Sequence, residues 1–245
     1  MSNAPESTLW LLVPVGQQAG GAWVDDTVAA RIAESEARDS LLARSPLVGQ
    51  FPRQRVEVIS ASNPAAEANE RYHQRGWTDG LPIVVPEVGA VKRMMRASPL
   101  SPTTILGELD PLRGQATLEK VAANAVMAGC RPEYFPIVVA AVQALVDPAF
   151  NLRGVQTTDE NVAPLLVVSG PIVRRLGINS GFGLLGPGWR ANASIGRALR
   201  LVMQNIGGGW PGAVSYAGLG QGSRYSLCIA EDESGSPWQI GRAHV

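Results

Sequence analysis

Cysteine and histidine are scarce in this sequence, and their scarcity excludes several kinds of site. The 245 residues contain two cysteines, Cys130 and Cys228, and two histidines, His73 and His244. The cysteines lie far apart and form no CxxC pattern, so no thiolate metal site is expected. A Ser-His-Asp triad is not expected either, because no serine lies in a nucleophile-elbow motif. The sequence therefore predicts no metal site and identifies no cofactor.

An excess of charge and long apolar runs are also missing. The chain has 21 basic and 21 acidic residues, so its net charge attracts neither nucleic acid nor an anionic membrane. No apolar run reaches the roughly 18 residues that a membrane helix requires. The first apolar run, residues 9–15, is short, is interrupted by Pro14 and lacks the basic flank of a signal peptide. We therefore expect a cytoplasmic protein with no nucleic-acid or membrane partner.

Glycine and proline, by contrast, are abundant, with 27 and 18 residues respectively. Strand-like apolar segments alternate with segments of helical periodicity, which predicts an α/β fold: a mixed sheet with helices packed on it and many loops. Residues 98–114 and 151–161 are expected to be loops. Strands are expected at 9–15, 56–59, 83–85, 165–169 and 224–230, and helices at 26–43, 64–75, 86–96, 117–129, 132–146, 172–176 and 190–206.

Composition along the chain suggests three parts. Residues 1–61 are more charged than the rest and are predicted to form an N-terminal α/β segment or subdomain. Residues 62–239 are predicted to form the main α/β domain around one core. Residues 240–245 read IGRAHV, which looks like the translation of a sequencing adapter. We interpret them as a non-native tail and expect the natural C-terminus to be truncated here.

The segment 179–209 is the first candidate binding region. Its glycine-rich loop leads into a predicted helix, and backbone N–H groups at a helix N-terminus favour anions. Arginines in the first turns of that helix oppose its dipole, so they need an anionic ligand or acidic side chains as partners. The segment matches neither a P-loop nor a dinucleotide fingerprint. The alternative is a purely structural loop, with Arg197 paired to Glu231 or Asp232. The predicted substrate-binding residues here are Asn179, Ser180, Gly181, Gly183, Gly186, Gly188, Arg190, Asn192 and Arg197.

Cys130 is the first candidate catalytic residue. It lies between two predicted helices, close to the positive end of the second and beside Arg131. Both neighbours are expected to lower the thiol pKa and to favour the reactive thiolate. The alternative is a small buried side chain at a helix turn. For Cys228, inside an apolar strand, the buried interpretation is preferred.

Glu119, Lys120 and Asn124 are polar residues on an otherwise apolar predicted helix. Buried polar groups must be paired or must line a cavity. We therefore predict Glu119 and Lys120 as acid/base catalytic residues and Asn124 as a substrate-binding residue. The equally weighted alternative is a buried ion pair or a partly exposed helix edge.

Three segments together resemble an uncharacterised bacterial protein family: GWTDGLPIV at 76–84, ATLEKVAANAVMAGCRPEY at 116–134 and GINSGFGLLGPGWRANASIGRALRLVMQNIGG at 177–208. CIAEDESGSPW at 228–238 fits the same resemblance. In some relatives this region is associated with a thioredoxin-like domain that carries a Sec/Cys-Gly-Ser-Cys motif. The resemblance implies thiol or selenol chemistry, detoxification of electrophiles and a thioredoxin-like partner. This chain contains no Gly-Ser-Cys, so the redox motif itself is not carried over.

Three hypotheses for the function remain open. The first is a small-molecule enzyme in which Cys130 is a nucleophile or metal-avid thiolate and Arg190 holds an anionic substrate group. The second is a lyase or hydrolase that uses Glu119 and Lys120 as acid and base. The third is a non-catalytic ligand-binding or partner subunit, in which Cys130 and the glycine-rich loop would share no pocket. A homo-oligomer is compatible with each hypothesis.

Overall fold

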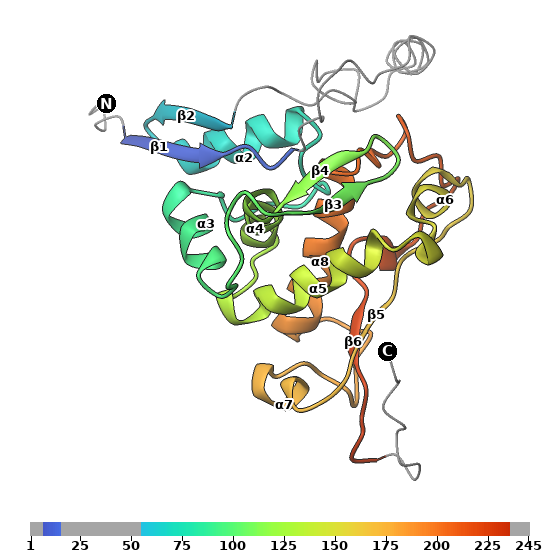
Figure 1. The fold of residues 1–245 in the computed structure, drawn as a ribbon. Helices are drawn as coiled ribbons and strands as arrows, with labels where there is room; N and C mark the ends of the chain where they lie inside the picture. Colours follow the sequence, from blue (N-terminus) through green and yellow to red (C-terminus); the bar gives the residue numbers. More distant parts are fainter. Residues whose placement is uncertain (1–6, 16–54, 236–245) are drawn as a thin grey trace.

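Two antiparallel strands from distant parts of the sequence form one end of the fold. The computed structural model describes residues 7–15 and 55–235 (Figure 1). Strand β1 (Ser7–Leu12) pairs with β2 (Val56–Ala61), with Leu12 opposite Val56. The strands predicted at 9–15 and 56–59 are confirmed with shifted ends. The predicted helix at 26–43 and the predicted tail at 240–245 lie outside the described residues.

The next two helices form where they were predicted, and the first of them has the expected end signals. Helix α2 (Pro64–Gln74) begins after Asn63, whose side-chain oxygen accepts a hydrogen bond of 3.2 Å from the Ala66 N–H. Gly76, with φ of 68°, follows the C-terminal end in the left-handed conformation. Helix α3 (Val88–Met95) lies within the predicted 86–96.

The predicted strand at 83–85 is wrong. The N–H of Ile83 donates to the side-chain oxygen of Asn69 at 2.8 Å, and the N–H of Val84 donates to the carbonyl of Met127 at 3.2 Å. The segment is extended, but it is fixed by a side chain and by the end of a helix. Its backbone therefore has no strand partner among the described residues.

Strand β3, the first residue of strand β4 and helix α6 lie in segments that were expected to be loops. Strands β3 (Ile105–Leu109) and β4 (Gly114–Thr117) form an antiparallel hairpin within the proline-rich region. Helix α6 (Leu152–Thr157) begins after Asn151, whose side-chain oxygen accepts from the Gly154 N–H at 3.3 Å.

Helix α4 (Leu118–Met127) lies at the centre of the molecule, and all ten of its residues are buried. It packs against α3, against α5 (Phe135–Leu145) and against α8 (Arg190–Asn205), as Figure 1 shows. The hydroxyl of Thr117 accepts from the Lys120 N–H and begins the helix, as predicted. Short 3-10 turns, η2 (Pro132–Tyr134) and η3 (Pro148–Phe150), flank α5.

A short parallel pair lies at the opposite end from β1 and β2 (Figure 1). It consists of β5 (Leu166–Val168) and β6 (Cys228–Ala230), with Leu166 opposite Cys228. Helix α7 (Ile172–Leu176) follows β5 as predicted. Of the strand predicted at 224–230 only the last three residues form β6, and Arg224 ends the 3-10 turn η4 (Gly222–Arg224).

The α/β class is confirmed, with helices packed against short sheets of two strands each in the part of the chain that the structure describes. One continuous core includes Tyr72, Trp77, Phe135 and Trp210. Within residues 7–15 and 55–235, no single helix is long and apolar enough to cross a membrane. The bent pair Pro132–Leu145 and Pro148–Thr157 meets that criterion only jointly, by length and composition.

Candidate functional site

The structure brings the Cys130 turn and the start of α8 together. The guanidinium of Arg190 donates two hydrogen bonds to the Gly129 carbonyl, from Nε at 3.3 Å and from Nη2 at 3.0 Å. The Cys130 thiol donates to the carbonyl of Ser194 at 3.2 Å. Arg190 therefore stabilises the C-terminal end of α4, where a cation is favourable, although it stands at the N-terminal end of its own helix.

This junction is packed rather than open. Cys130 is 8% exposed, and burial raises the pKa of its thiol to about 12. The predicted lowering of this pKa is wrong, because the loss of hydration outweighs the effects of the hydrogen bond to Ser194 and of the charge on Arg190.

The asparagines of the glycine-rich loop hold the loop on the helix. Asn192 is buried; its side-chain oxygen accepts from the Asn179 N–H at 2.8 Å, and its Nδ2 donates to the carbonyls of Asn179 and Cys228. The side-chain oxygen of Asn179 accepts from the Gly181 N–H at 2.9 Å. These polar groups are used inside the protein, so the predicted role of Asn179 and Asn192 in substrate binding stays a prediction.

The rest of the loop is largely on the surface. Gly183 and Gly188 have φ of 72° and 113°, which only glycine adopts readily. Gly181 and Gly186 are exposed and Ser180 is partly buried. None of the three cavities described below is lined by Cys130 or by this loop.

Arg197 has an acidic partner, but it differs from both residues considered in the sequence. Its guanidinium binds the Asp79 carboxylate through two hydrogen bonds, Nε to Oδ2 at 2.7 Å and Nη2 to Oδ1 at 2.8 Å. The two side chains are 17% and 3% exposed. The alternative pairing with Glu231 or Asp232 is therefore wrong. Arg197 fixes the turn at 76–80 against α8.

Glu119, Lys120 and Asn124 bind segments of the N-terminal region to α4. Glu119 accepts two hydrogen bonds from the Arg55 guanidinium, at 2.6 and 2.7 Å. The Lys120 ammonium donates to the carbonyl of Val13 at 2.5 Å, and burial lowers its pKa to about 8. Asn124 donates to the Pro14 carbonyl at 3.0 Å, and its side-chain oxygen accepts from Asn205 at 2.8 Å. These contacts agree with the structural alternative, and acid/base catalysis by Glu119 and Lys120 stays a prediction.

An open cleft lies elsewhere, and reasoning from the sequence missed it. Its volume is about 970 Å³, and its walls come from the C-terminal part of α2, the turn at 76–80, the middle of α8 and residues 211–225. Glu70 and His73 face it from α2, and Ser215 and Tyr225 from the last segment. A separate hollow, of about 530 Å³, lies between β1, β2 and the start of α3.

Two arginines, Arg200 of α8 and Arg224 of η4, meet in this cleft. Burial and, to a smaller extent, the nearby charge of Arg224 lower the pKa of Arg200 to about 10. Burial also lowers the pKa of Arg224. Among the described residues neither side chain forms an ion pair. Asp79 lies near enough to favour the charge on Arg200, but both of its carboxylate oxygens are bound to Arg197.

The hydrogen bonds of the two arginines leave several donors available. Nη2 of Arg200 donates to the side chain of Gln204 at 3.3 Å and to the Gly209 carbonyl at 3.2 Å. Nη2 of Arg224 donates to the Ser215 hydroxyl at 2.6 Å. In the described part of the chain, Nε and Nη1 of both arginines have no hydrogen-bond acceptor. Two partly desolvated cations with available donors are suited to holding an anion.

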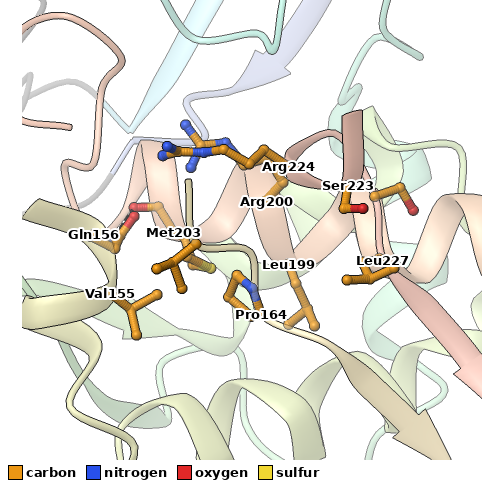
Figure 2. A pocket seen from close by; sticks show the side chains of 12 residues that line it. Val155, Gln156, Pro164, Leu199, Arg200, Met203, Ser223, Arg224 and Leu227 are labelled. Atoms are coloured by element: carbon orange, nitrogen blue, oxygen red, sulfur yellow. Dashed lines mark hydrogen bonds between the residues drawn. The ribbon is translucent and has the colours of Figure 1, made fainter. Parts of the chain in front are cut away.

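The same two arginines also line a much smaller cavity, of about 20 Å³ (Figure 2). In that view the guanidinium groups lie along one side, and Val155, Pro164 and Leu199 lie on the other. Arg200 and Arg224 are the residues that the small cavity and the open cleft share. They therefore stand at the junction of the two spaces.

Of the two arginines, only Arg200 has a position in the sequence that indicates its place in the cleft. Arg200 lies three residues after Arg197 and four before Gln204, which places it beside them on one face of a helix. Arg224 was assigned to a strand, and nothing in its neighbours indicates that residues 211–225 return to α8.

A scan against protein-family models and searches of curated proteins and of solved structures found no match to this chain. Within the described ranges, no three histidine, cysteine, aspartate or glutamate side chains are grouped as metal ligands.

Proposed function

We propose that this protein binds a small organic anion in the open cleft, with Arg200 and Arg224 holding the anionic group. The observation that carries the proposal is the meeting of these two arginines in a cleft without an ion-pair partner among the described residues. Bringing two guanidinium groups together costs electrostatic and desolvation energy. A bound carboxylate or phosphate offsets that cost through charge-assisted, bidentate hydrogen bonds.

The cleft also offers groups for the remainder of such a ligand. Tyr225 is half exposed and presents an aromatic surface, while His73 and Glu70 are exposed on the facing helix. These side chains can accept or donate hydrogen bonds to polar parts of a ligand. The volume of about 970 Å³ falls near the upper end of the range typical of small-molecule sites, about 300–1,000 Å³.

The thiol-dependent reaction predicted from Cys130 has less support than anion binding. The thiol is buried, carries a raised pKa and lines none of the three cavities. A thiol-dependent activity, a thioredoxin-like partner and a homo-oligomer therefore stay predictions.

Titration with sodium acetate at constant ionic strength, followed by amide NMR shifts, tests the proposal. Saturable shifts are expected near Ser215 and Arg224. Arg224→Gln keeps most of the side-chain volume and removes the charge, so it is expected to weaken binding roughly 10- to 100-fold, the loss of one charge-assisted contact. Arg93→Gln, an exposed arginine on α3, makes the same change in net charge at a distant position.

The control variant is expected to bind acetate as the parent protein does. If acetate binding weakens equally in both variants, the weakening results from the change in net charge and not from the loss of Arg224. Acetate that does not saturate in the parent protein, or that binds equally well to Arg224→Gln, would refute the proposed site.

A further inference from the structure

The small cavity behind the two arginines has a wall that is mainly apolar. Six of its lining residues carry apolar side chains: Val155, Val162, Pro164, Leu199, Met203 and Leu227. They come from α6, from the segment before β5, from α8 and from the segment before β6. An apolar group that enters this space leaves water without losing hydrogen bonds.

Two of the polar residues of the cavity have partners elsewhere. The Nε2 of Gln156 donates to the carbonyls of Asp110 and Met203. Its Oε1 is buried with no hydrogen-bond partner among the described residues and lies against Gly209, which does not line the cavity. The hydroxyl of Ser226 donates to the Ala193 carbonyl at 2.8 Å. The Nε2 of Gln156 and the hydroxyl of Ser226 are therefore already used within the protein and offer little to a polar group that enters the cavity.

The size of the cavity limits what it accepts. By the same measure, a space of roughly 10–15 Å³ holds one water molecule, and this cavity has about 20 Å³. It therefore has room for one group of the size of a methyl. Longer or branched substituents need the open cleft on the other side of the arginines.

We infer that this cavity is the subsite for a methyl-sized apolar group on the carbon next to the anionic group of the ligand. The inference rests on the proposed function, because the arginines at the junction must hold the anion for its neighbouring carbon to reach the cavity. The smallest ligand of this class is acetate, whose α-carbon is itself the methyl group, and larger carboxylates of the class carry the methyl group on the α-carbon. The rest of the molecule extends into the cleft.

The test compares carboxylates of graded size by NMR titration of the full chain. Acetate is expected to bind about four-fold more tightly than formate, the gain from one buried methyl group. Pivalate, whose α-carbon carries three methyl groups, is expected to bind more weakly than acetate. Glycolate is expected to gain nothing over acetate.

A variant and a matched control then assign the preference to this cavity. Val155→Ile places an additional carbon in the cavity and is expected to abolish the preference for acetate over formate. Val88→Ile makes the same change at another half-buried valine, which lines the hollow beside β1, and is expected to keep the preference. If Val155→Ile unfolds, Val155→Ala serves instead, and its larger cavity is expected to improve the binding of 2-methylpropionate relative to acetate.

The outcomes separate the subsite from the anion site. Equal affinity for formate and acetate, tighter binding of glycolate, or a preference that survives Val155→Ile would overturn the methyl subsite, while a loss in Arg224→Gln would still support anion binding. A failure of every carboxylate to saturate would overturn both.

Discussion

Removing one member of the Arg197–Asp79 pair should destabilise the protein, and the structure predicts which removal costs more. Asp79 is the more deeply buried partner, at 3% exposure against 17% for Arg197. After Asp79→Asn, the guanidinium keeps the carbonyls of Leu81 and Pro82 as acceptors, at 3.3 and 2.9 Å. After Arg197→Met, the carboxylate keeps a single turn hydrogen bond from the Leu81 N–H at 3.3 Å.

Breaking a buried pair from one side costs about 3–5 kcal/mol, because a charge stays buried without its partner. We expect Arg197→Met to lie in this range and Asp79→Asn to cost less. For a chain of this length, 3 kcal/mol lowers the unfolding temperature by roughly 6–12 °C. The double variant should cost little more than Arg197→Met alone, since the charge that Arg197→Met leaves unpaired is then absent.

Urea unfolding followed by tryptophan fluorescence measures these free energies. Glu108→Gln is the matched control, because it breaks a more exposed ion pair, to Arg113, whose side chains are 35% and 57% exposed. That change is expected to cost at most about 1 kcal/mol. The reasoning fails if both variants of the buried pair cost no more than Glu108→Gln. Arg197 would then be available to a ligand, as its position in the sequence suggests.

Two buried ionisable side chains give the remaining predictions. Burial raises the pKa of Cys130 to about 12, so iodoacetamide should modify this thiol at least about 1,000-fold more slowly than a free thiol at neutral pH. Peptide mass spectrometry measures the rate, and modification of the folded protein at the free-thiol rate would contradict the prediction. Burial lowers the pKa of Lys120 to about 8, so between pH 8 and the unfolded value near 10.4 the unfolded chain binds more protons and stability rises with pH. Between pH 7.5 and 9 the free energy of unfolding of the parent protein should rise by roughly 1 kcal/mol relative to that of Lys120→Met. The control Lys92→Met, at the exposed second lysine, should show no such difference from the parent protein. If the difference between the parent protein and Lys120→Met does not change with pH, the prediction is refuted.

Elements with local signals were predictable from the sequence. Asn63 and Thr117 stand at helix starts, and their side chains make the capping hydrogen bonds that their residue types suggest. The hairpin of β3 and β4 was not predictable in the same way. Its sequence is rich in proline and glycine, which usually mark loops, and its pairing depends on residues that face one another only after folding.

The candidate site depended still more on contacts between distant residues. Arg197 and Asp79 are separated by 118 positions, so the correct partner could not be chosen over nearer acidic residues. Likewise, the cleft joins residues near 70–80 with residues near 200 and 211–225. The sequence predicted the turn and the helix as elements but not the cleft between them, and the fold brings Arg224 to Arg200 there.

The arginines of helix α8 share one helix but have different partners. Arg190 binds the carbonyl of Gly129 just after the C-terminal end of α4, and Arg197 is neutralised by Asp79. Arg200, almost one turn further on, has neither a helix end nor a free carboxylate, and the neighbouring charge of Arg224 opposes its own. An arginine in the first turns of a helix thus does not by itself indicate an anion site, because the protein can supply its own acceptors. The proposed anion site rests instead on a partly buried cation whose partners among the described residues do not balance its charge, and on this helix that residue is Arg200.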